Sequence, residues 1–133
     1  MKYFAYGSNL CVRQMQARCA NAKRLFSARL PNYALIFTGG SRVSSGGTAT
    51  IRLQKGTQVL GGVYEIDDRC LLSLDKHEGY PLVYDRMNVI VFNDFGDAVE
   101  AVAYFKKGRA VEEPASKEYL ALIREGYRDW GLL

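Results

Sequence analysis

One carboxylic acid stands out as a residue able to do chemistry. Glu78 lies in "LDKHEGYPLVYDR", where a helical pattern ends at Gly79 and apolar and aromatic residues follow. A carboxyl group in such surroundings has a raised pKa and can accept and return a proton near neutral pH. A solvated Glu at a helix end is the simpler interpretation, because most Glu side chains are exposed. The C-terminal end of a helix disfavours a carboxylate, however, and this favours a functional role for Glu78.

A turn near the N-terminus, "YGSNL", offers groups that bind an anion. Gly7 lets the backbone approach a ligand closely, and the following amides open a helical pattern, where N–H groups lack partners and the dipole is positive. A carboxylate of a ligand suits this place. A nucleotide is not indicated, because the turn lacks the length and the lysine of a phosphate-binding loop. An ordinary tight surface turn is the alternative interpretation.

The other reactive side chains form weak patterns. His77 is the single histidine, so a triad built on Ser8 and His77 is disfavoured, and so is a histidine-based metal site. Cys11, Cys19 and Cys70 are an odd number without regular short spacing. We therefore expect reduced thiols rather than a disulfide framework or a zinc site.

Size and charge define a broad class. The chain has 133 residues, 48% of them hydrophobic, which predicts a single domain over 1–133 with a real core. Lys and Arg number 18 against 14 Asp and Glu, and the densest basic stretch is only 18–24, so nucleic-acid binding is not expected. No apolar run approaches the ~20 residues that span a bilayer, and no signal-peptide pattern follows Met1. We expect a cytoplasmic protein without a membrane partner, as a monomer or a homodimer.

Strand and helix patterns surround these residues. The opening reads as a strand over 2–6, a tight turn, and a helix over 10–19 capped by Ser8 or Asn9. Further helices are expected over 67–79 and 116–130. The other strand-like segments are 25–39, bent at Pro31–Asn32, then 48–53, 58–66, 84–94 and 98–107, of which the last two form a hairpin. The Gly- and Ser-rich segment 39–47 is a loop and a candidate lid. About six or seven strands with short helices predict an α+β domain, typical of a small closed barrel.

Three segments together resemble the γ-glutamylcyclotransferase family. They are "YFAYGSNL", "GGVYEI" and "LDKHEGYPLVYDR", and the resemblance runs in the same order from Tyr3 to about Tyr119. It implies a small mixed α+β barrel. It also implies an intramolecular reaction, in which a γ-glutamyl amide or peptide cyclises to 5-oxoproline and releases an amine. The substrate's own α-amine is the nucleophile, so neither a cofactor nor a metal is called for.

The resemblance also implies roles for individual residues. Glu78 matches the acid/base glutamate of the family, Tyr84 matches a tyrosine that lines the pocket, and Tyr119 matches a binding tyrosine. The substrate-binding loop matches Tyr3, Phe4, Ala5, Tyr6, Gly7, Ser8, Asn9 and Leu10. The backbone amides of this loop are expected to hold either the substrate's α-carboxylate or the developing oxyanion.

The leaving amine and the alternative functions stay open at this level. "YGSNL" resembles members that act on γ-glutamyl peptides, whereas Pro81 and the pair Tyr84-x-Arg86 resemble members that act on γ-glutamyl amines such as γ-glutamyl-lysine. One alternative is a binding protein that holds a γ-glutamyl-like metabolite without turning it over. Another is an interaction scaffold that exposes the helix at 119–130, although we expect that helix to pack into the core.

Overall fold

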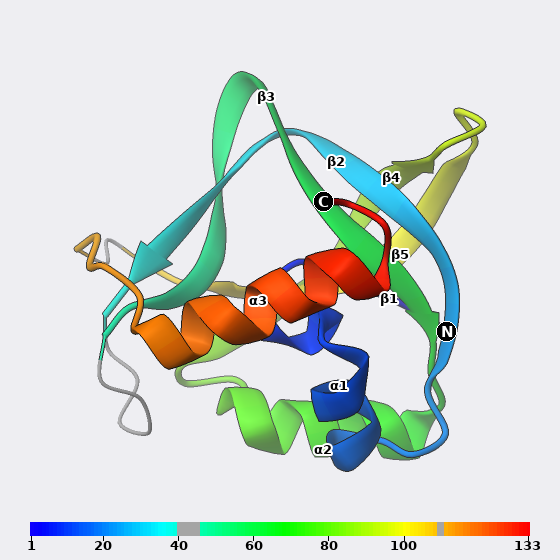
Figure 1. The fold of residues 1–133 in the computed structure, drawn as a ribbon, viewed down its shortest axis with the longest axis horizontal. Coiled ribbons are helices and arrows are strands. Elements are labelled where there is room, and N and C mark those ends of the chain that lie inside the picture. The colour runs from blue at the N-terminus through cyan, green and yellow to red at the C-terminus, as the bar shows by residue number, and fades with distance from the viewer. Residues whose placement is uncertain (40–45, 109–110) are drawn as a thin grey trace.

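The computed structural model describes residues 1–39, 46–108 and 111–133, so most of the expected lid at 39–47 lies outside the described residues. The elements run in the order β1 (Lys2–Ala5), a 3-10 turn η1 (Ser8–Leu10), α1 (Val12–Arg18), β2 (Lys23–Thr38), β3 (Thr48–Glu65), α2 (Asp68–Glu78), β4 (Tyr84–Asn93), β5 (Ala98–Lys106) and α3 (Lys117–Asp129). Figure 1 shows α3 crossing one side of the strands, with α1 and α2 together at one end.

The described strands close into a five-stranded barrel in the order β1-β3-β2-β4-β5. β1 runs antiparallel to β3 and parallel to β5, so the barrel is mixed. The remaining neighbours are antiparallel, including the expected hairpin of β4 and β5. The prediction of a small mixed α+β barrel with flanking helices is therefore confirmed.

The strand count is lower than six or seven because two expected strands are one. β3 continues through 54–57, the segment that separates them in the sequence pattern. β2 and β3 bend together there, with a register shift between Pro31 and Tyr33. Asn32 and Gly56 take left-handed backbone angles (φ 64° and 88°), and the Gly56 N–H donates to Asn32 Oδ1 at 3.2 Å. Asn and Gly adopt left-handed backbone angles more easily than other residues do. The two strands can therefore bend here, and their pairing resumes beyond the bend.

β1 contributes side chains to two cores. Phe4, together with Tyr6 directly after the strand, belongs to a cluster that draws on all five strands and fills the barrel. Tyr3 and Ala5 belong to a second cluster, which packs against the helices through residues such as Leu74. Successive side chains of a strand point to opposite faces, which explains the division. β1 is thus buried on both sides and delivers its C-terminal turn at the boundary between barrel and helices.

The helices begin and end largely where the sequence predicts. Asp67 caps α2 by accepting from the Cys70 N–H at 2.8 Å, and Ser116 caps α3 by accepting from the Tyr119 N–H at 3.1 Å. The expected capping of the first helix by Ser8 or Asn9 is wrong, since those residues form η1 and α1 begins only at Val12. None of the described helices is long and apolar enough to cross a membrane.

The expectation of reduced thiols is wrong for two of the cysteines. Cys19 and Cys70 form a disulfide, with Cα atoms 5.3 Å apart, while Cys11 stays free and buried. The two partners are 51 residues apart in the chain. They meet because the end of α1 packs against the start of α2, which a count of cysteine spacings does not show.

Breaking this bridge is expected to lower the free energy of unfolding. The bridge closes a loop of 51 residues. In the chain-entropy model, this lowers the conformational entropy of the unfolded chain and stabilises the folded state by about 4 kcal/mol. We expect the double variant Cys19→Ser/Cys70→Ser to unfold at a lower urea concentration than the oxidised wild type. A reductant should shift the wild type toward the variant and leave the variant unchanged. A wild-type midpoint that does not respond to reductant would contradict a stabilising bridge.

Candidate active site

A cavity of about 930 Å³ lies where the turn after β1 meets the end of α2. Its walls come from β1, η1, α1, the start of β3, α2, β4, β5 and α3. A smaller cavity of about 390 Å³, between β2 and the β4–β5 hairpin, is lined by Arg29, Phe92 and their neighbours and contains no buried acid. The larger cavity therefore holds the groups able to do chemistry.

Glu78 enters this cavity as the last residue of α2. Gly79 follows in a left-handed conformation (φ 70°), and the Tyr80 N–H returns to the Asp75 carbonyl at 2.9 Å, which ends the helix at once. The Glu78 side chain is only 17% exposed. Burial raises the pKa of this carboxyl, and the opposing effects of Arg18, Asn9 and Lys106 only reduce the rise. The group is thus suited to accept a proton at a higher pH than an ordinary Glu.

Asn9 joins Glu78 to the rest of the wall. Its Nδ2 donates to Glu78 Oε1 at 3.3 Å and to the Tyr3 hydroxyl at 2.9 Å. Its Oδ1 accepts from Gln14 at 3.2 Å and from Arg18 at 3.0 Å. Because the residue is only 3% exposed and its amide is bonded at both ends, its orientation is fixed.

Two tyrosines hold another part of the wall through a single residue, Ala49. The Tyr84 hydroxyl donates to the Ala49 carbonyl at 2.6 Å, and the Tyr119 hydroxyl accepts from the Ala49 N–H at 3.0 Å. A Cβ at Gly7 would lie 3.1 Å from the Ala49 Cβ and 3.4 Å from the Tyr119 oxygen, so a glycine keeps this wall close to the turn. Burial raises the pKa of both hydroxyls, which therefore stay protonated at neutral pH.

Most of the expected site residues meet at this cavity. The lining includes Glu78, Tyr3, Tyr6, Gly7, Ser8, Asn9, Tyr84 and Tyr119. Phe4, Ala5 and Leu10, which the resemblance also places in the substrate loop, do not line the cavity. Each is at most 1% exposed and packs in one of the two cores. Their side chains fix the strand and the turn rather than form the wall.

Two polar lining residues on α1 were not expected from the sequence, Gln14 and Arg18. They are four residues apart and so share one helix face. That spacing is visible in the sequence, and it could have placed both beside the turn that precedes the helix. Tyr104 also lines the cavity, although it was not among the site residues expected from the sequence.

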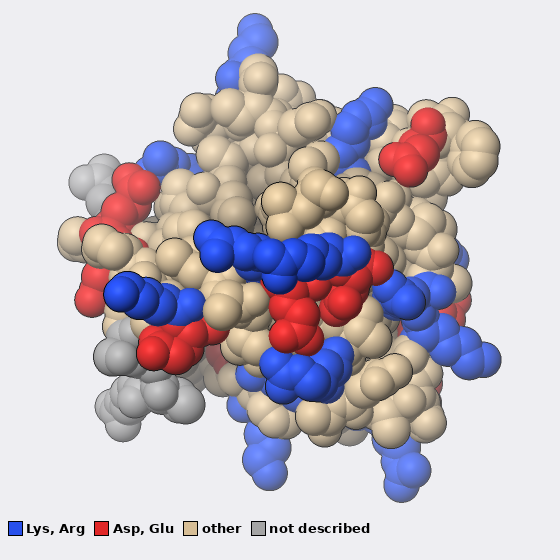
Figure 2. Space-filling view, viewed as in Figure 1, with Lys and Arg blue, Asp and Glu red and all other residues tan. Residues whose placement is uncertain are grey.

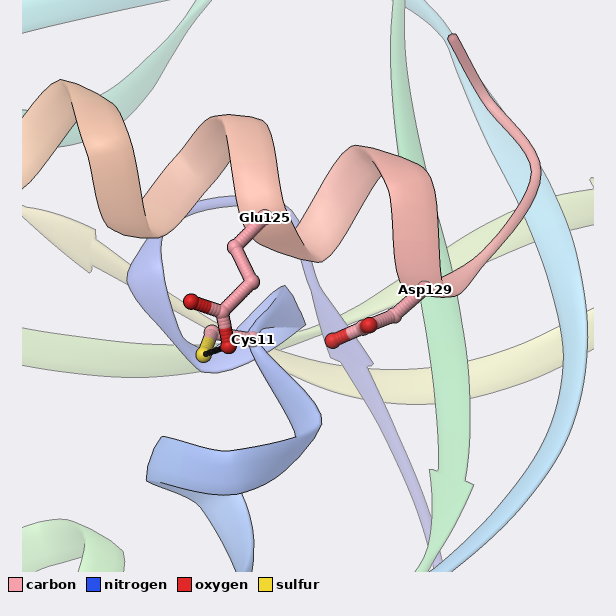
Figure 3. A group of neighbouring side chains, drawn as sticks. All are labelled: Cys11, Glu125 and Asp129. Atoms are coloured by element: carbon pink, nitrogen blue, oxygen red, sulfur yellow. Dashed lines mark hydrogen bonds between the residues drawn. The ribbon is translucent and has the colours of Figure 1, made fainter.

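A second polar cluster lies where α3 crosses the start of α1. Cys11 Sγ donates to Glu125 at 3.0 Å (Figure 3). Arg13 donates twice to the same carboxylate at 3.2 Å, and the Val12 N–H donates to Asp129 at 2.9 Å. The ligand atoms of Cys11, Glu125 and Asp129 lie within 4.8 Å of one another, a spacing that suits a metal. Burial and Glu125 raise the pKa of the Cys11 thiol, however, and Arg13 already neutralises Glu125. We interpret the cluster as the link that caps α1 from α3.

Charges around α3 are mixed rather than of one sign. In Figure 2 a row of Lys and Arg side chains runs over α3, with acidic side chains directly beneath it. The Arg13–Glu125 pair, at 3.2 Å, belongs to this region. Over α3, the positive side chains on the face shown thus have acidic neighbours.

Comparison with known proteins identifies the family. The chain matches the family model "Gamma-glutamyl cyclotransferase, AIG2-like" over residues 3–130. It is 32% identical to gamma-glutamylcyclotransferase of Homo sapiens and 33% identical to that of Bos taurus, in each case over 98% of this chain and 71% of the relative. A solved structure titled "Gamma-glutamyl cyclotransferase" superposes with a TM-score of 0.94 at 31% identity, covering 99% of this chain and 80% of that one. A mouse AIG2-like protein, with 20% identity and a TM-score of 0.63, shares the fold.

Fold and sequence thus define the class of an enzyme of the γ-glutamylcyclotransferase type. The chain belongs to the γ-glutamylcyclotransferase, AIG2-like family. The resemblance inferred from the three sequence segments is confirmed.

The buried acid should make the protein less stable at neutral pH than a neutral equivalent would. The pKa of Glu78 is raised in the folded state, so its contribution to stability is complete below the pKa of an unfolded Glu, ~4.3, and is lost as the pH rises through the folded value. We expect Glu78→Gln to melt at a higher temperature than the wild type at pH 7–8. The difference should vanish near pH 4. A variant that melts lower at neutral pH would mean that Arg18 and Asn9 outweigh the burial.

Proposed function

We propose that this protein converts a γ-glutamyl amide or peptide to 5-oxoproline and a free amine, with Glu78 as the general acid and base. The observation that carries the proposal is the Glu78 carboxyl itself. It is largely buried, with a raised pKa, and it faces a tyrosine-lined cavity. The family membership of the chain supplies the reaction class.

Glu78 would move two protons in sequence. Its carboxylate first takes a proton from the α-ammonium group of the substrate. The freed amine attacks the γ-carbonyl carbon, and the new C–N bond closes a five-membered ring with an oxyanion. When the oxyanion collapses, the original amide C–N bond breaks and the leaving nitrogen takes this first proton from Glu78. The Glu78 carboxylate, ionised again, then removes the second proton from the ring nitrogen, which leaves the neutral lactam, and passes it to the released amine. Atoms and charges balance without water or another reactant.

The turn after β1 offers donors for the anionic parts of the substrate. Within it, the N–H groups of Leu10 and Cys11 already donate to the carbonyls of Gly7 and Ser8, at 3.1 and 3.0 Å. The first N–H groups of a 3-10 turn have no partner inside the turn, so those of Ser8 and Asn9 are the ones suited to a ligand. Both the α-carboxylate of the substrate and the oxyanion of the ring intermediate need donors of this kind.

The cavity wall can also fold the substrate. Tyr119 accepts a hydrogen bond from Ala49 and keeps its own O–H proton, which can be donated into the cavity. A wall that holds the glutamyl chain bent brings its amine against its own γ-carbonyl. Well-oriented intramolecular reactions gain several orders of magnitude in rate from such positioning.

Release of 5-oxoproline from a small substrate panel tests the proposal. The panel is γ-glutamyl-alanine, γ-glutamyl-ε-lysine, glutathione and a γ-glutamyl alkylamine, and it also ranks the leaving amines. We expect product from at least one of them and a loss of about 100-fold or more in Glu78→Gln, the usual scale for removing a general acid–base group. Glu100→Gln is the matched control, because Glu100 is exposed on β5 and does not line the cavity.

Two results would contradict this reading. Unchanged turnover in Glu78→Gln would remove Glu78 from the proton transfers. If the folded wild type releases no product from the panel but calorimetry shows that it binds one of these compounds, the binding-protein alternative is favoured.

The pH dependence of the reaction should follow Glu78. Because the carboxylate must be ionised to act as the base, kcat/KM is expected to rise with pH through the pKa of Glu78. Burial raises that pKa, so the acid limb should lie above the ordinary value of ~4.3 for Glu. The measurement is the kcat/KM profile of the best panel substrate from pH 4 to 9. An acid limb at the ordinary value would mean that a solvated group controls the rate.

A further inference from the structure

We propose that Arg18, at the end of α1, is a positioning residue for this reaction. It orients the Asn9 amide so that the amide N–H groups and the guanidinium charge together hold the Glu78 carboxylate toward the cavity. The proposal rests on the proposed role of Glu78 and goes beyond it, because it assigns a task to a residue outside the turn and outside α2.

The contacts of Asn9 explain how Arg18 acts. Arg18 Nη1 lies 3.0 Å from Asn9 Oδ1 and 3.8 Å from Glu78 Oε1. A guanidinium only donates, so it selects the oxygen of the amide and turns the NH₂ group toward Glu78. In the reverse orientation, the amide N–H groups would face the guanidinium and the amide oxygen would face the carboxylate. Both contacts would be repulsive, so Arg18 selects the orientation that supports an ionised Glu78.

The backbone of Arg18 is attached to the helix that carries Glu78. Ser73 Oγ donates to the Arg18 carbonyl at 2.6 Å, and the next residue, Cys19, is bonded to Cys70. Ser73 and Cys70 both lie on α2. The two partners of the ion pair therefore come from segments that are joined at two further points. Less conformational entropy is lost when such a pair forms than when two free surface side chains meet.

The other basic side chains near Glu78 are placed differently. Lys106, on β5, donates to the carbonyls of Thr38 and Gly39 at 2.7 and 3.3 Å, and it lies over the Tyr84 ring. It thus tethers the end of β2. Lys76 and His77 belong to the last turn of α2 itself and are exposed. The remaining titratable groups that face the cavity are the tyrosines Tyr3, Tyr6, Tyr84, Tyr104 and Tyr119.

These tyrosines carry no charge near neutral pH, because burial raises the pKa of each of them. Among the described residues, Arg18 is then the cation that reaches Glu78 both directly, at 3.8 Å, and through a shared hydrogen-bonded amide. Without it, the Asn9 oxygen keeps the Gln14 amide at 3.2 Å but loses the cation that selects its orientation, and the protonated form of Glu78 gains population at neutral pH.

Two measurements on the full chain test the proposal. One is the titration of the Glu78 carboxyl by ¹³C NMR, assigned with Glu78→Gln, and the other is the pH profile of kcat/KM. In Arg18→Gln we expect both midpoints to move to higher pH by about one unit, a roughly tenfold loss of kcat/KM on the acid limb. Arg18→Met, which keeps the apolar stem, provides a second neutral variant if Arg18→Gln does not fold. Arg18→Lys keeps the charge and should lie between Arg18→Gln and the wild type.

Arg13→Gln is the matched control. Arg13 lies on the same helix and also pairs with a glutamate, but it is outside the cavity. The Arg13→Gln variant should leave both the NMR midpoint of Glu78 and the midpoint of the kcat/KM profile unchanged. A neutral variant at position 18 with the wild-type Glu78 midpoint, or with a rate loss equal at every pH, would overturn the proposal and leave Arg18 a merely structural residue.

The NMR arm separates this proposal from the proposed function. If no substrate of the panel gives 5-oxoproline, or if Glu78→Gln keeps its turnover, the assigned function fails. A shifted Glu78 midpoint in Arg18→Gln would still support the control of Glu78 by Arg18. An unshifted midpoint in a protein that does release 5-oxoproline would instead overturn the role of Arg18 alone.

Discussion

The structure depends on keeping one carboxyl group where burial disfavours its charge. Glu78 ends α2 inside a cavity, and burial raises its pKa despite nearby cations. Both the desolvation and the helix C-terminus act against an ionised group at this position. Such a placement persists only when the surrounding structure is stable enough to impose it, and this is typical of functional sites. The barrel and the helical layer supply that stability.

A comparison of two acids on α2 shows how the surroundings assign their roles. Asp75 receives two hydrogen bonds from the Arg86 guanidinium at 2.8 and 2.9 Å and one from the Tyr104 hydroxyl at 2.6 Å. A carboxylate satisfied in this way fixes α2 to β4 and β5 and has little capacity left for a substrate. Glu78, one turn later, accepts one hydrogen bond from the Asn9 amide at 3.3 Å and lies 3.8 Å from the Arg18 guanidinium. The first acid therefore anchors the helix, and the second stays available at its end.

Local sequence signals predicted the parts of the fold that depend on neighbours in the chain. The caps Asp67 and Ser116 and the glycine at position 79 mark α2 and α3 because capping acts over three or four residues. The single long β3 was missed, since its bend depends on pairing with Asn32 across the hairpin. The Cys19–Cys70 bridge was missed for the same reason, because it depends on how α1 packs against α2. Glu78 could be found from its setting, whereas the hydrogen bonds that control it join residues up to 69 positions apart.

The packing also limits what the mixed sequence motifs say about the leaving amine. Of the three features that resemble members acting on γ-glutamyl amines, Tyr84 lines the cavity but Pro81 and Arg86 do not. Arg86 donates to Asp75 at 2.9 Å and lies over the Tyr80 ring, 4.1 Å from its centroid. Its role is therefore structural. A framework residue positions α2 without contacting a substrate, and it therefore carries no direct preference for one amine over another. In the function we propose, selectivity for the leaving group comes from side chains of the cavity wall, such as those that α1 and the last turn of α2 present.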